Sequence, residues 1–119
     1  MKPTELIDRI MEQEKAVRYV AILSTGQLFS KARPGISGGS SSESDKYEEL
    51  LVNPTLLKLT TQRGAIDCGG LNYILVRYGN FFQWISPLVD GHISVCIDSK
   101  SEPLSIITRL LLLTGAQHP

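Results

Sequence analysis

The chain of 119 residues has little of several residue types, and each shortage excludes a class of function. Its only cysteines, Cys68 and Cys96, form no Cys-x-x-Cys pair and have no histidine at zinc-ligand spacing, so neither a metal site nor another cofactor is predicted. The longest aliphatic run, residues 110–113, is far shorter than the ~20 residues that cross a bilayer. Twelve basic and twelve acidic residues cancel, which leaves no overall charge to attract nucleic acid or an anionic membrane.

Signatures of common catalytic sites are also missing. No lysine of the P-loop type follows the glycine-rich stretch, so phosphate binding there is not predicted. The serines of that stretch lack the strand–turn–helix setting of a nucleophile elbow. Glu48 and Glu49 are adjacent and so do not share a helix face; we expect them on a solvated face rather than as an acid–base pair. We therefore predict a protein that is not an enzyme.

The apolar pattern predicts a single α+β domain over residues 1–119. Apolar residues recur at helical spacing near the N-terminus, and β-branched residues form short strands joined by short turns. Short connections favour antiparallel pairing, so we expect a five-stranded antiparallel sheet with helices packed on its faces. The predicted elements are a helix over 4–15, a hairpin over 17–32, a helical segment from 45 to about 63, strands over 71–78, 81–86 and 92–98, and a helix between 101 and 115.

Two features interrupt the helical segment or precede it. Eight of the ten residues in 35–44 are glycine or serine, which predicts a flexible loop because such residues bury little apolar surface. Asn53-Pro54 is expected to break or kink the helix, since proline lacks an N–H donor and disfavours helix at the residue before it. Asn53 would then cap a second helix, which we expect to end at Gly64.

Charge and aromatic residues are unevenly distributed. Residues 16–35 carry three basic residues and no acid, a net charge of +3, whereas residues 36–53 carry four acids and one lysine, a net charge of −3. The basic stretch has too few interleaved aromatics to suggest nucleic-acid binding. Five of the eight aromatic residues lie within 73–84, where they fit either a sheet core or an interface. In the last helix, Ile106, Leu112 and Leu113 fall partly outside the apolar stripe, and they fit either a wide core contact or a partner-facing patch.

The element order, read together with VRYVAILSTGQLFS at 17–30 and LNYILVRYGNFFQWISPL at 71–88, resembles the roadblock / dynein light chain family. The Thr25-Gly26 turn and the Pro87-Leu88 step carry part of that resemblance, which covers most of the chain. It implies a roadblock/profilin-like fold and a non-enzymatic module. Family members form homo- or heterodimers with a sheet that continues across the interface, and they bind small Ras-like GTPases or serve as adaptors in motor and signalling complexes.

The resemblance also implies where partners bind. Family dimers pack through the middle helix and the adjacent strand, and an edge strand has unpaired backbone groups that invite such pairing. The strand over 71–78 is our candidate edge, and a homodimer is expected. The candidate partner-binding residues are Tyr47, Leu50, Leu51, Tyr73, Leu75 and Tyr78.

Two other functions stay open. A small-molecule sensor would hold its ligand in a profilin-like pocket between the sheet and the helical segment, near Cys68 and Trp84. An enzyme would need Cys68 as nucleophile and His92 as base. Because the N-terminus has no apolar signal segment, we expect a cytoplasmic protein.

Overall fold

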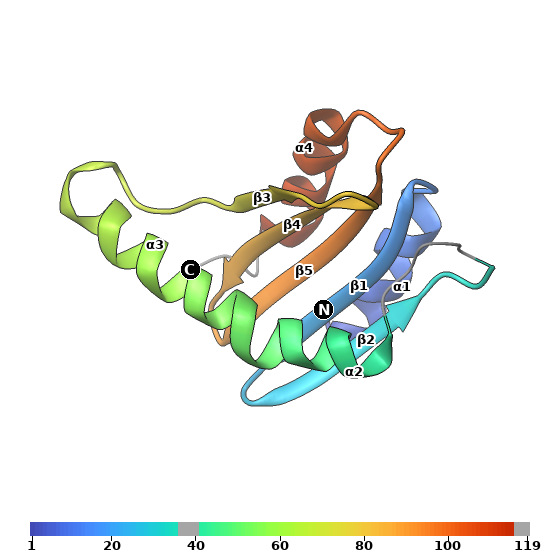
Figure 1. Cartoon of the computed structure of the whole chain (residues 1–119), viewed down its shortest axis with the longest axis horizontal. Coiled ribbons are helices and arrows are strands. Elements are labelled where there is room, and N and C mark those ends of the chain that lie inside the picture. The colour runs from blue at the N-terminus through green and yellow to red at the C-terminus, as the bar shows by residue number, and fades with distance from the viewer. Residues whose placement is uncertain (36–40, 116–119) are drawn as a thin grey trace.

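The structure is a computed structural model that describes residues 1–35 and 41–115, and it has the predicted α+β architecture (Figure 1). These residues form a five-stranded antiparallel sheet of order β2-β1-β5-β4-β3, with β2 and β3 at its edges. The elements are α1 (Pro3–Gln13), β1 (Val17–Ser24), β2 (Gln27–Ala32), α2 (Ser42–Tyr47), the π-helical turn η1 (Glu48–Val52), α3 (Asn53–Asp67), β3 (Ile74–Arg77), β4 (Phe81–Leu88), β5 (Gly91–Asp98) and α4 (Pro103–Thr114).

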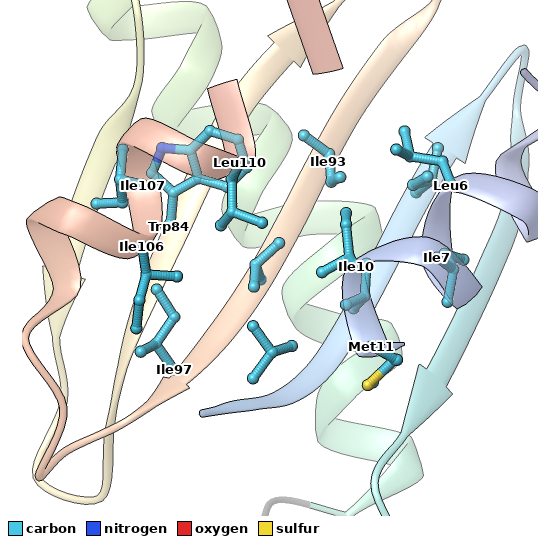
Figure 2. Close-up of a cluster of buried hydrophobic side chains, with 14 residues drawn as sticks. Leu6, Ile7, Ile10, Met11, Trp84, Ile93, Ile97, Ile106, Ile107 and Leu110 are labelled. Carbon is cyan, nitrogen blue, oxygen red and sulfur yellow. The ribbon is translucent and has the colours of Figure 1, made fainter. Parts of the chain in front are cut away.

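The main hydrophobic core lies between the sheet and the two terminal helices, α1 and α4. Apolar side chains of both helices meet Trp84 and the inward-facing residues of β1 and β5 (Figure 2). This confirms the predicted apolar stripe of α1, because its four members at helical spacing are all buried. Those members are Leu6, Ile7, Ile10 and Met11.

The opposite face of the sheet is crossed by one continuous helical path, α2–η1–α3 (Figure 1). Its sheet-facing residues recur at every fourth position, beginning with Glu49 and Asn53 and continuing to Leu57. The sheet contributes Gln83 and Ser94 on this side, joined by a hydrogen bond of 2.6 Å. The layer beneath α2–η1–α3 is therefore partly polar, unlike the core under α1 and α4.

The expected break at Asn53-Pro54 is wrong. Asn53 has helical backbone angles, and its N–H donates to the carbonyl of Glu48, five residues earlier, instead of capping a new helix. A proline ring would collide with the carbonyl four residues before it, here that of Leu50. The wider π-helical turn is one of the known ways to relieve such a conflict, so the helix passes through Pro54 without ending.

Gly64 is also used differently from the prediction, because α3 continues past it to Asp67. A Cβ on Gly64 would lie 3.2 Å from Gly70 C and from Leu71 N, so its small size permits close backbone approach. The N–H of Gly70 donates to Gly64 O over 3.1 Å, which fixes this contact. The glycine thus allows the following loop to pack on the helix rather than terminating the helix.

Other boundaries differ from the predictions by a few residues. β3 covers only Ile74–Arg77 of the predicted 71–78. β4 continues beyond the predicted residue 86 through Pro87, and β3 has no residue paired with Pro87. Proline is tolerated there because its missing N–H is not needed on the unpaired side. In the predicted loop 35–44, residues 36–40 lie outside the described residues, while 42–44 form the first turn of α2, capped by Ser41.

Candidate functional site

The predicted partner-binding residues of the helical path lie on its outer face. Tyr47, Leu50 and Leu51 are each more than half exposed, as are Leu59 and Ile66 further along α3. We call these five residues the outer stripe. Exposed large apolar side chains that recur along one surface helix are a common feature of protein interfaces. The outer stripe is therefore a candidate docking surface.

The predicted residues near β3 are divided between the two faces of the sheet. Tyr73 and Leu75 pack against the core under α4, with the Tyr73 ring centroid 6.4 Å from that of Trp84. Tyr78 lies on the other face, where its hydroxyl donates to Glu48 Oε1 over 3.1 Å. The fold therefore brings Tyr78 to the helical path but keeps Tyr73 and Leu75 away from it.

The outer edge of β3 presents backbone groups to its surroundings. Tyr78 N donates to Phe81 O over 2.9 Å, so these two residues form a hydrogen-bonded pair at the β3–β4 turn. In an antiparallel ladder, hydrogen-bonded and non-hydrogen-bonded pairs alternate. The N–H and C=O groups of Leu75 and Arg77, which pair opposite Trp84 and Phe82, therefore face outward.

A buried polar cluster joins the helical path to the sheet. Glu49 Oε1 accepts a hydrogen bond from Asn53 Nδ2 at 3.0 Å and lies 2.8 Å from His92 Nε2. Glu49 and Asn53 are 0% exposed and His92 is 2% exposed. The expectation of a solvated Glu49 is wrong, because the four-residue spacing of Glu49 and Asn53 turns both toward β5. The four-residue spacing of Glu49 and Asn53, together with a histidine at the start of a buried strand, was the sequence signal that could have predicted this buried cluster.

A cleft of about 380 Å³ opens between this helical path and the sheet. Its walls include Asp45, Glu48 and Glu49 from the helix, with Tyr78 and Phe81 from the β3–β4 turn region. The rings of Tyr78 and Phe81 form a tilted pair with centroids 5.5 Å apart. Two further carboxylates and an aromatic pair thus line the same cleft as Glu49.

The electrostatics of this region reflect burial and concentrated negative charge. Burial raises the pKa of Glu48 and of Tyr78, and neighbouring carboxylates act in the same direction. Burial likewise raises the pKa of the Cys96 thiol, and the charge of Glu49 adds to that effect. Each shift has the sign expected where a further negative charge is disfavoured.

The pocket predicted near Cys68 and Trp84 is misplaced. Cys68 is exposed at the end of α3, whereas Trp84 is buried on the opposite face of the sheet. His92 is occupied by Glu49, and the Cys68 thiol donates to Asp67 Oδ1 over 3.4 Å. The predictions of a buried Cys96 and a more accessible Cys68 are confirmed, and both thiols are free.

Two other kinds of site have no candidate in the described part of the chain. Within residues 1–35 and 41–115, no group of three or more His, Cys, Asp or Glu side chains is placed to hold a metal ion. No helix in the same ranges has the length and apolar character to cross a membrane.

Comparison with known proteins finds solved structures of similar fold at low sequence identity. No family model matches the chain, and neither does any curated protein. The crystal structure of a Roadblock/LC7 domain from Streptomyces avermitilis superposes with a TM-score of 0.73 at 11% identity, over 98% of this chain and 94% of that one. MglB in a tetrameric arrangement gives a TM-score of 0.70 at 9% identity, covering 95% of this chain and 82% of the other.

A third match supports the same assignment. The gliding protein mglB from Thermus thermophilus gives a TM-score of 0.63 at 9% identity, over 95% of this chain and 80% of that one. All three comparisons cover nearly the whole chain, including the sheet and the helices on both of its faces. This chain therefore has the roadblock/LC7 fold.

Proposed function

We propose that this protein is a non-enzymatic interaction module that works as a homodimer. The observation that carries the proposal is the open edge of β3, with the outward backbone groups of Leu75 and Arg77. Pairing of two such edges would satisfy these groups and extend the sheet. The Tyr78–Glu48 hydrogen bond links this end of the sheet to the helix that carries the outer stripe. Strand pairing and apolar helix contact could therefore occur in one interface.

The partner that we propose for the dimer is a small Ras-like GTPase or another subunit of a signalling or motor complex. Support comes from the roadblock/LC7 fold and from the family resemblance of the sequence. A dimer that joins two sheets offers a broad rigid platform, which suits a regulator or scaffold that acts through contact rather than through chemistry. The cytoplasmic location expected from the sequence stays a prediction.

Sedimentation at micromolar concentration tests the dimer. We expect a species of twice the 13.1 kDa chain mass, and a single 13.1 kDa species would overturn the proposal. Arg77→Pro removes one outward N–H while leaving the β3–β4 ladder intact, because that donor does not pair with β4. This variant should weaken the dimer. Arg77→Ala is the control, because it also loses the contact between the Arg77 side chain and the Phe82 ring but keeps the backbone N–H, and it should leave the dimer intact.

Partner identity needs a separate experiment. The tagged chain is purified from a lysate of its native cells together with the proteins that bind it. One sample contains a non-hydrolysable GTP analogue and a second contains GDP, so that any bound GTPase is held in one nucleotide state. Enrichment of a Ras-like GTPase in one nucleotide state would support regulation of that GTPase. Recovery of a stable set of other subunits, with no GTPase, would favour the scaffold role in its place.

A small-molecule sensor is the second candidate, and one observation favours it. The cleft between η1 and the sheet has a volume of about 380 Å³, within the range of small-ligand pockets, roughly 300–1,000 Å³. Such a ligand would bind beside Glu49 rather than near Cys68 and Trp84.

A further inference from the structure

We propose that the cleft between η1 and the sheet binds an organic cation, an ammonium or guanidinium group, against the carboxylate of Glu49. The proposal goes beyond the dimer and names the ligand class for the alternative sensor function. It does not depend on dimerisation, since none of the outer-stripe residues lines the cleft among the residues described.

The first argument is the incomplete hydrogen bonding of Glu49. Its Oε1 is used by Asn53 and His92, but its Oε2 has no hydrogen-bond partner in the described part of the chain. The side chain is 0% exposed and still forms part of the cleft wall. Leaving a buried charged acceptor without a donor is costly, so a donor that enters from the cleft would be strongly favoured.

The second argument is the sign of the charge around the cleft. Asp45 and Glu48 line it together with Glu49, while no lysine or arginine within 1–35 or 41–115 does so. The nearest basic side chains line an adjoining cleft that shares Gly79 and Asn80 with this one, and Arg18 there donates to the carbonyl oxygen of Asn80 over 3.1 Å. A cation is thus complementary to this cleft, and an anion is excluded by it.

The third argument concerns the aromatic wall, which selects an organic cation. Tyr78 and Phe81 line the cleft, and aromatic faces attract ammonium and guanidinium groups. Phe81 already interacts in this way, because the Arg18 guanidinium carbon lies 5.8 Å from its ring centroid. A bare metal ion would gain little from such rings, and the described side chains offer it no cluster of three ligands.

The test is a titration of the full chain, labelled with ¹⁵N, by agmatine, which carries both an ammonium and a guanidinium group. Ionic strength is held constant, and succinate serves as the anionic control. Saturable shifts of the Gly79 and Cys96 amide signals are expected with agmatine and not with succinate. A parallel titration with a capped five-residue peptide, one arginine among glycines, shows whether a free cation or a protein side chain is preferred. Tighter binding of either probe supports the proposal.

Variants connect the binding to Glu49. Glu49→Gln keeps the size of the side chain and removes its charge, so agmatine affinity should fall by roughly tenfold or more, as expected for loss of a charge-assisted hydrogen bond. Glu43→Gln removes an exposed charge that lies on α2 outside the cleft, and it should leave affinity unchanged. If Glu49→Gln does not fold, Glu48→Gln provides the same comparison from the cleft wall.

Three results would overturn the proposal. The first is that neither probe gives a saturable shift. The second is that agmatine and succinate give equal shifts. The third is that the Glu43→Gln variant loses as much affinity as the cleft variants. Sedimentation of the same samples keeps this outcome separate from the dimer. A dimer that binds no cation refutes only the cleft, and a monomer that binds agmatine refutes only the dimer.

Discussion

The imidazole of His92 lies with its Nε2 2.8 Å from Glu49 Oε1, and this contact joins β5 to the helix that crosses it. Both side chains are buried, and Asn53 donates to the same carboxylate oxygen. A polar link of this kind is satisfied in one geometry only, whereas an apolar contact tolerates sliding. The pair therefore helps to set where η1 lies on the sheet, and with it the walls of the cleft and the direction of the outer stripe.

Removing Glu49 should destabilise the fold. Glu49→Ala leaves His92 and Asn53 buried without their shared acceptor, so we expect a loss of about 2–4 kcal/mol in the free energy of unfolding. Urea denaturation measures it. Glu43→Ala, on an exposed position of the neighbouring helix, should change stability by less than ~0.5 kcal/mol.

A double-mutant cycle between Glu49 and His92 separates their interaction from other effects of the substitutions. Glu49→Ala, His92→Ala and the double variant should give a coupling energy of about 1 kcal/mol or more, because both partners are fully desolvated. Strict additivity would mean that the contact contributes nothing of its own.

Stability should decline in acid through Glu14, which joins α1 to α4. The Arg109 guanidinium donates from Nε to Glu14 Oε2 at 2.7 Å and from its second nitrogen to Oε1 at 2.8 Å. These hydrogen bonds hold the pKa of Glu14 below its ordinary value of 4.5. Since the folded state binds this proton less readily than the unfolded state, the contribution is present above pH 4.5 and is lost as pH falls through the folded-state pKa.

The matched variant for this prediction is Glu14→Gln. Near neutral pH the wild-type protein should be the more stable of the two in urea. The difference should shrink as pH falls below 4.5, where the wild-type carboxyl becomes protonated. A difference that stays constant from neutral pH to strongly acidic pH would contradict the role of the ion pair.

Gly91 should not tolerate a side chain, although its position at a strand start looks permissive. A Cβ there would lie 1.8 Å from the carbonyl oxygen of Leu23 on the adjacent strand. Gly91→Ala should therefore cost about 2 kcal/mol or more, because backbone of the central sheet must move. Gly79→Ala is the control, since a Cβ at Gly79 meets no atom of the described chain within 4 Å. Thermal unfolding distinguishes the two variants.

The outer stripe can be tested apart from the strand edge. Leu50→Asp or Leu51→Asp would place a charge in the proposed dimer interface, so the dissociation constant of the dimer should rise at least about tenfold. Leu112→Asp changes a leucine of α4 that is 80% exposed and should leave dimerisation as it is. Sedimentation measures all three variants. An equal effect of Leu112→Asp would place the interface elsewhere.

The two thiols should differ in reactivity. Cys68 is exposed, whereas Cys96 is buried and has a raised pKa, so little of its reactive thiolate forms. Iodoacetamide at neutral pH should label Cys68 alone, with a second label added only in denaturant. Mass spectrometry counts the labels, and rapid double labelling of the native protein would contradict the buried position of β5.

Much of the fold could be predicted from local pattern. The helical spacing of Leu6 and Ile10 and the β-branched runs of β1 and β5 depend only on which residues are apolar and how far apart they stand. Periods of 3.6 and 2 are consequences of backbone geometry, so they can be recognised without knowing what packs against what. The edge position of β3 is also observed, but it was expected from the family resemblance and not from local pattern.

The candidate site depended on contacts that no local window contains. Glu49 is buried because it pairs with His92. His92 lies 43 residues away in the sequence, so the residues around Glu49 gave no sign of that partner. Tyr73 and Tyr78 are five residues apart, so strand alternation alone places them on opposite faces, but only the packing of the sheet decided that Tyr73 is the one that meets the core. Continuity through Pro54 depended on a π-helical turn beside a buried Glu49–Asn53 pair.

The sequence by itself thus determined the order of the main elements and the apolar stripe that α1 buries. Only the tertiary structure decided which polar groups would be enclosed, since the free energy of burying a charge depends on a partner that folding brings from elsewhere in the chain.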